Sequence, residues 1–135
     1  MTQLSIQVNG AEIVRKGLQD LSAEIPKIGR LQIYRTSQGI VSKMKQYPPP
    51  PPASMYIRTG TLGGGWMIVS NSNGYTIRND THYTKWVVGN AYGLEQAWMH
   101  VGRWQKLRDV TEEETGKLPA EIEKEITMVA RRLGL

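Results

Sequence analysis

A run of five prolines at positions 48–52 limits how this chain can fold more than any other feature of its sequence. Each proline lacks a backbone N–H and disfavours helical geometry in the residue before it. A helix that precedes the run must therefore end there, and a new element must begin after it. As a polyproline II rod, the run would span roughly 15 Å at about 3.1 Å per residue.

Polyproline II rods also bind in aromatic grooves of other protein domains. The run could therefore instead be a binding site for a partner domain of that kind. Ligands of that kind lie in polar tails, whereas this run lies between a predicted helix and a predicted hairpin. We therefore interpret it as a rigid spacer that carries the chain from the helix to the hairpin.

Length and composition favour one domain over residues 1–135. The absence of cysteine excludes a disulfide scaffold and thiolate metal sites, and fits a reducing compartment. The first ten residues lack the basic and apolar regions of an export signal, and no apolar stretch approaches the ~20 residues that cross a membrane. We expect a protein that is made in a cytoplasm and has no membrane partner.

The N-terminal part of the chain is predicted to be mainly helical. Leu4, Ile6 and Val8 alternate with polar residues, which predicts a strand ending at the Asn9-Gly10 pair. An apolar stripe then predicts a short amphipathic helix ended by Pro26, with the members Val14, Leu18, Leu21 and Ile25. A second helix is predicted over residues 26–46, with Pro26 in its first turn.

The C-terminal part mixes strands and helices. Residues 65–80 alternate around the turn sequence NSNG, which predicts a hairpin with Trp66, Ile68 and Ser70 on one face. Residues 82–90 predict a short helix or turn that closes at Gly89, and residues 91–105 a long structured loop. Two helices follow, one over about 104–115 and one over 118–133, separated at Gly116.

The net charge of +5 is unevenly distributed along the chain. Residues 1–108 carry 13 Lys and Arg against 5 Asp and Glu, which gives +8, whereas residues 109–135 carry 4 against 7, which gives −3. A basic body favours a polyanionic partner such as nucleic acid. Contacts between oppositely charged surfaces of identical copies are the interpretation we favour, because the basic residues are scattered singly.

No motif in the sequence indicates an enzyme. The segment GTLGGGW lacks the lysine of a phosphate-binding loop and precedes a predicted strand, and no G-x-S-x-G elbow is present. His82 and His100 have no carboxylate at metal-ligand spacing except Asp80, so we interpret both as hydrogen-bonded surface or loop residues. The run from Glu112 to Glu114 is typical of a solvated helix face. We predict no catalytic residue, no cofactor and no metal ion.

A small basic nucleic-acid-binding protein is the alternative function. Aromatic residues lie beside cations in TKWVV, GRWQK and MYIR, as they do in platforms that stack bases. No sequence motif of a known nucleic-acid-binding module accompanies them.

Three blocks of the chain, YIRTGTLGGGW (56–66), HYTKWVVGN (82–90) and QAWMHVGRWQ (96–105), resemble blocks of the head–tail joining proteins of long-tailed siphophages. This is the neck or tail-completion family, whose members are also described as minor tail proteins. The matching residues are Arg58, Thr59, Gly60, Leu62 and Trp66 in the first block and Tyr83, Trp86, Val87 and Gly89 in the second. Trp86 stands where tyrosine is common. Gly65 stands where serine usually precedes the tryptophan, which removes any cap or turn hydrogen bond of that hydroxyl.

The resemblance implies a small, mostly antiparallel sheet packed by a long helix. With the predicted elements it gives an α+β fold that has the long helix in its N-terminal half, a C-terminal helix and long ordered loops. It also implies a structural role without catalysis, in a ring of identical copies, a hexamer or a dodecamer, at the junction of phage head and tail. The partners would be other neck and tail proteins of the virion, with packaged DNA nearby, and assembly would occur in the host cytoplasm.

Aromatic and Met-containing loops often form the centres of protein interfaces. The third block supplies such a loop, and its candidate interface residues are Trp98, Met99, His100 and Trp104. Packing within the chain is an equal alternative for Trp98 and Met99, and is the favoured interpretation for Trp66 and Trp86. Gly60 and the glycines at 63–65 are expected to provide positive φ or a close backbone approach.

Overall fold

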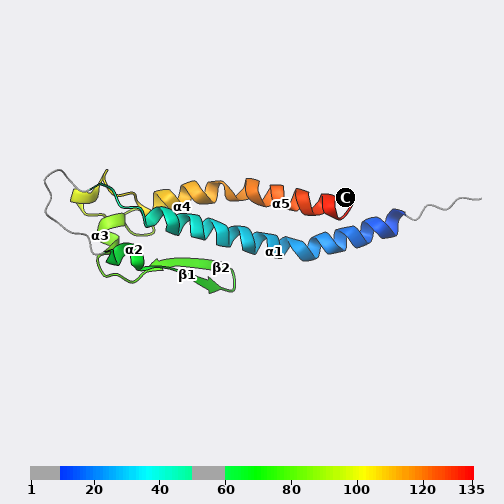
Figure 1. Cartoon of the computed structure of the whole chain (residues 1–135), viewed down its shortest axis with the longest axis horizontal. Coiled ribbons are helices and arrows are strands. Elements are labelled where there is room, and N and C mark those ends of the chain that lie inside the picture. The colour runs from blue at the N-terminus through cyan, green and yellow to red at the C-terminus, as the bar shows by residue number, and fades with distance from the viewer. Residues whose placement is uncertain (1–9, 50–59) are drawn as a thin grey trace, which may run out of the picture.

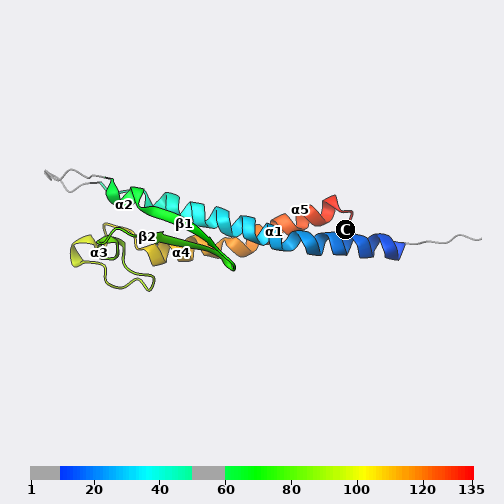
Figure 2. The ribbon, with the colours of Figure 1, turned by 90° about the horizontal axis from the view of Figure 1, so that it is seen from below.

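A helix of 35 residues, α1 (Gly10–Met44), forms the long axis of the molecule (Figure 1). The computed structural model describes residues 10–49 and 60–135. Two helices, α4 (Leu107–Gly116) and α5 (Leu118–Arg132), follow one another along one side of α1. A hairpin of β1 (Trp66–Asn71) and β2 (Gly74–Asn79) packs against the C-terminal half of α1 (Figure 2). The fold is therefore mixed α+β, with the predicted antiparallel sheet packed by a long helix.

Pro26 does not end a helix, contrary to the prediction, because α1 continues through it as one element. A proline inside a helix removes one hydrogen bond and costs about 3 kcal/mol. Contacts on both sides of Pro26 hold α1 against the C-terminal helices and offset that cost. On one side Leu135 approaches Gly17, and on the other Lys43 pairs with Glu114. Figure 1 shows that α1 bends along its length rather than running straight.

The hairpin forms as predicted. A two-residue turn joins the strands, and their register pairs Trp66 with Asn79 and Ile68 with Ile77. Trp66 and Ile68 turn inward, whereas Met67 and Val69 are exposed on the outer face. Arg30 ties the turn to α1, since it donates to Ser70 Oγ at 2.6 Å.

The hydrophobic core lies at one end of the molecule, where α1 ends and the hairpin begins. The short helices α2 (Thr61–Gly64) and α3 (Thr84–Val88) close this end, together with a 3-10 turn, η1 (Trp98–His100). The buried cluster consists of Ile40, Val41, Met44, Leu62, Trp66, Val87, Val88 and Val110. Burial at one end leaves the rest of α1 to pack mainly against α5.

Several predictions concern residues outside the described part of the chain. The predicted strand lies there except for Gly10, which begins α1. Pro48 and Pro49 follow α1 in irregular backbone, while the rest of the proline run is not described. The interpretation of the run as a spacer stays a prediction.

Candidate functional site

The residues of the first matching block serve mainly as core. Arg58 and Thr59 lie outside the described residues. Leu62 and Trp66 are buried in the core cluster, and Gly60 has φ +79°, as expected for a glycine that enters a short helix. Leu62 and Trp66 therefore support the fold from inside, whereas Gly60, Thr61 and Gly64 of the same block are exposed.

Gly65 is required by a close approach of the chain to Asn79. A Cβ atom at position 65 would lie 2.5 Å from Asn79 Oδ1 and 2.7 Å from Thr81 Oγ1. The Asn79 side chain uses this position to donate to the Leu62 carbonyl at 2.7 Å and to accept from the Thr81 N–H at 3.0 Å. Asn79 thus links the end of β2 to both α2 and the turn at Thr81.

The second block forms α3 and the turn after it. Tyr83 packs against the core cluster, and Gly89 ends α3 with φ +79°. We expected Trp86 to pack within the chain, but its side chain is 47% exposed. The Lys85 ammonium lies 4.8 Å from the centre of the Trp86 ring. Lys85 and Trp86 together present an aromatic and cationic surface.

The third block divides between core and surface. Trp104 packs beside Tyr47, with 5.2 Å between ring centroids, and joins the rim of the core. Trp98 is 84% exposed and Met99 is also exposed, so neither packs within the chain. His100 lies edge-on to Trp104, and burial, with a smaller contribution from Arg103, lowers the pKa of its imidazole. Trp98 and Met99 therefore remain the interface candidates of this block.

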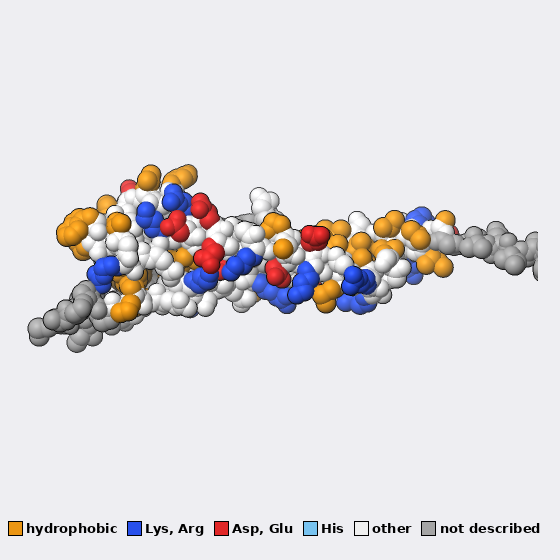
Figure 3. Space-filling model, turned by 90° about the horizontal axis from the view of Figure 1, so that it is seen from above, with side chains coloured by type: hydrophobic (Ala, Val, Ile, Leu, Met, Phe, Trp, Pro, Cys, Tyr) orange, Lys and Arg blue, Asp and Glu red, His pale blue; other side chains and the backbone are white. Residues whose placement is uncertain are grey.

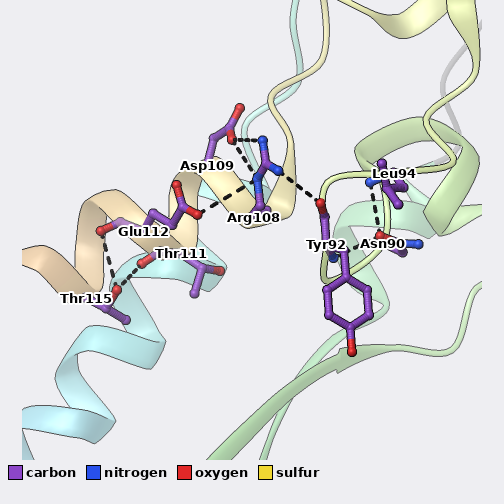
Figure 4. A network of polar contacts seen from close by, with 8 residues as sticks. All are labelled: Asn90, Tyr92, Leu94, Arg108, Asp109, Thr111, Glu112 and Thr115. Carbon is purple, nitrogen blue, oxygen red and sulfur yellow. Dashed lines mark hydrogen bonds and ion pairs between the residues drawn. The ribbon is translucent and has the colours of Figure 1, made fainter.

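A loop between α3 and η1 adds two exposed apolar residues that the sequence did not single out, Tyr92 and Leu94. Asn90 holds this loop, because its Oδ1 accepts from the backbone N–H groups of both residues at 2.9 and 3.0 Å (Figure 4). Arg108 of α4 donates to the Tyr92 carbonyl at 3.0 Å and ties the loop to α4. The loop is therefore fixed in place although its side chains are exposed.

Gly93 permits this contact with Arg108. Its φ is +74°, and a Cβ atom there would lie 2.7 Å from the guanidinium carbon. Arg108 also contacts Asp109 and Glu112, whose carboxylates lie 3.3 and 3.9 Å from its nitrogens. Figure 4 shows the Tyr92 ring pointing away from Arg108 toward the strands of the hairpin.

A groove of about 780 Å³ lies between β2, α1 and α4. Most of its lining is apolar or carries a hydroxyl group. Ile77 of β2, Ile33 and Ile40 of α1 and Leu107 of α4 contribute to it, and Tyr92 lies at the end next to the loop. Such a lining suits a peptide segment with apolar side chains better than a small charged ligand.

Exposed apolar side chains gather near the two ends of the molecule (Figure 3). The end near η1 carries Trp86, Leu94, Trp98, Met99 and Val101. The opposite end, where α1 begins and α5 finishes, carries Ile13, Val14, Leu18, Met128 and Leu135. We call these the loop end and the helix end. Soluble monomers rarely expose large contiguous apolar patches, so surfaces of this kind mark interaction sites.

Part of the charge asymmetry is neutralised within the chain. Lys43 of α1 lies 3.0 Å from Glu113 and 2.6 Å from Glu114 of α4. The hydrogen bond to Glu114 is the main reason that the pKa of Lys43 is raised, and it likewise lowers the pKa of Glu114. In contrast, α5 carries three carboxylates that form no ion pair with any described residue: Glu121, Glu123 and Glu125.

Within residues 10–49 and 60–135, no three His, Asp or Glu side chains come close enough to hold a metal ion. Over the same residues, no helix has the length and apolarity needed to span a membrane. Asp80 pairs with Arg78 at 3.1 Å, and the His82 ring lies edge-on to the Tyr83 ring.

Comparison of the chain with protein families, with curated proteins and with solved structures finds no match.

Proposed function

We propose that this chain is a structural subunit of the phage neck, which joins the DNA-filled head to the tail in a ring of identical copies. The observation that carries this proposal is the pair of exposed apolar surfaces near opposite ends of an elongated subunit (Figure 3). A subunit with two different contact surfaces forms heterologous contacts, which close into a ring when the rotation between copies allows it. The three sequence blocks that resemble head–tail joining proteins give this assembly its biological setting.

The anchoring of the exposed loop supports the same role. Tyr92 is exposed, yet Asn90 and Arg108 fix its backbone. The exposed Trp98 follows Ala97, whose N–H donates to the Trp86 carbonyl at 2.7 Å. A rigid aromatic surface loses little conformational entropy when it binds a partner. Nucleic-acid binding has less support, because acidic and basic side chains are interspersed along the face in Figure 3.

The proposal requires that the gene be needed for joining heads to tails. Phage that lack the gene are expected to accumulate filled heads and separate tails, visible by electron microscopy of lysates. Wild-type protein supplied from a plasmid should restore joined particles, and the Trp98→Asp variant should not. Leu31→Asp, which changes an exposed leucine between the two ends, is the matched control and should restore joining. Normal joined particles without the gene would contradict the proposal.

A further inference from the structure

One edge of the hairpin is open for another strand. The turn closes between Asn71 and Gly74, so these residues exchange backbone hydrogen bonds, as does every second pair along the ladder. The intervening residues of β2, Tyr75, Ile77 and Asn79, therefore direct their N–H and C=O groups away from β1. No backbone group within the described ranges bonds to them from that side. An unpaired edge of this kind is a template for strand addition.

The open edge borders the groove. Tyr75, Thr76 and Ile77 all line it, and Leu107 and Thr111 of α4 line it as well. A strand added to β2 would lie about 4.8 Å from it and would point alternate side chains to opposite faces of the sheet. One face would meet the apolar groove lining, and the other would continue the outer face, where Thr76 and Arg78 are exposed. The site therefore selects a segment that alternates apolar and polar residues.

The chain contains such a segment outside the described residues. Leu4, Ile6 and Val8 alternate with Ser5 and Gln7, and no proline interrupts them. The five residues match the length from Tyr75 to Asn79. Their apolar side chains would face Ile33 and Ile40 in the groove, while the polar ones would lie on the exposed face.

The segment cannot reach this edge within its own chain. The hairpin turn contacts α1 at Arg30, which donates to Ser70, and Arg30 lies about 30 Å along the helix from Gly10 at 1.5 Å per residue. The six residue steps from Gly10 back to Leu4 span at most about 22 Å. Residues 4–8 therefore end well short of β2, which extends beyond the turn and away from Gly10 (Figure 1). Residues 4–8 could therefore pair with this edge only from a second copy.

We propose that residues 4–8 of one copy add as a third strand to β2 of the next copy. This inference rests on the proposed assembly of identical subunits, and it says how neighbouring copies interlock. The segment precedes the helix end of one subunit, and the groove reaches the loop end of the other at Tyr92. The Tyr92 ring, which is 77% exposed, is available to cover the added strand.

Disulfide trapping tests the strand directly, because the natural chain contains no cysteine. Full-length chains with Ser5→Cys or Gln7→Cys are mixed with differently tagged chains carrying Thr76→Cys and oxidised mildly. Residues opposite Thr76 on an added antiparallel strand form a closely spaced pair, whose geometry suits a disulfide. The matched control replaces Thr76→Cys with Ser42→Cys, an exposed position of α1. We expect about tenfold more mixed-tag dimer with Thr76→Cys, since the added strand raises the effective thiol concentration.

Two proline variants complete the test. Ile6→Pro removes a strand N–H and should abolish the Thr76 cross-link, whereas Thr2→Pro lies before the segment and should leave it unchanged. Cysteine variants that assemble but give no more cross-link with Thr76→Cys than with Ser42→Cys would overturn the strand and leave the proposed function standing. A cross-link that survives Ile6→Pro would also overturn the strand. Wild-type chain that stays monomeric at all concentrations would overturn the ring itself.

Discussion

Gly65 lies where the Asn79 side chain makes a local set of hydrogen bonds. Asn79 lies at the end of β2, and its amide nitrogen donates to the Leu62 carbonyl. Its amide oxygen accepts from the Thr81 N–H and from the Thr84 hydroxyl, the latter at 3.2 Å. The amide occupies the space that a side chain at position 65 would need. A serine at 65 and the Asn79 amide therefore exclude one another, because both claim the same volume.

Replacement Gly65→Ser should destabilise the folded chain by about 1–3 kcal/mol, the usual cost of forcing atoms into a filled site. The backbone at Gly65 has φ −86°, so the cost comes from space and not from backbone strain. Gly64→Ser is the matched control, because no atom lies within 4 Å of a Cβ built there. Its effect should stay within about 0.5 kcal/mol. Urea unfolding measures both, and equal stabilities for the two variants would contradict this account.

Helices and strands could be predicted from the sequence where residues close together along the chain determine them. The hairpin follows from alternation around the turn, and the C-terminal helices follow from their apolar period. Propensity describes an isolated segment, so it predicts a helix end at Pro26 that the folded chain does not have. Tertiary packing on both sides of Pro26 supplies the stability that the local sequence lacks.

The candidate interface could be predicted only in part. Trp66 and Trp98 are equal as residue types, but one lies at the start of a strand beside the core and the other on an exposed turn. The sequence favoured packing within the chain for Trp66, which is buried, but also for Trp86, which is exposed, because the position of α3 on the core cannot be read from a local pattern. The groove joins β2, α1 and α4, which are far apart in sequence, so no local pattern could have located it.

The ion pair between α1 and α4 should make stability depend on pH in a defined direction. The pKa of Glu114 is lowered in the folded chain, so its ionised carboxylate stabilises the fold. This stabilisation is fully present above about pH 4.3, the pKa of Glu in the unfolded chain, and is lost as pH falls through the folded pKa. The pKa of Lys43 is raised in the folded chain, so its ammonium group also stabilises the fold. This stabilisation is fully present below about pH 10.4, the pKa of Lys in the unfolded chain, and is lost as pH rises through the folded pKa.

Lys43→Met should therefore lower Tm slightly at pH 7, and the difference from wild type should disappear at a pH below the folded pKa of Glu114. The effect is small because both partners contact solvent. Lys45→Met is the matched control, since Lys45 is exposed and has no ion pair with the described residues. Thermal unfolding followed by circular dichroism across pH gives the comparison. A Tm difference that persists unchanged into acid would show that lost packing, and not charge, causes it.

At the scale of the whole molecule, the two apolar surfaces lie near opposite ends and differ in composition. The loop end is rich in aromatic residues, whereas the helix end carries aliphatic ones. A surface that pairs with its own copy produces a closed dimer, while a surface that pairs with a different surface produces a ring or a filament. A ring in the phage neck needs the second arrangement, in which the loop end of one copy contacts the helix end of the next.

A charged residue introduced at one end at a time distinguishes pairing of like ends from pairing of unlike ends. Trp98→Asp blocks the loop end and Ile13→Asp blocks the helix end, and neither should affect folding because their side chains are 84% and 75% exposed. If the loop end binds the helix end, each variant alone stays monomeric, because every copy lacks the same half of the contact. An equimolar mixture retains one intact contact and should stop at heterodimers, which light scattering after gel filtration resolves. Homodimers of either variant alone would instead indicate pairing of like ends, and that result would exclude the head-to-tail ring.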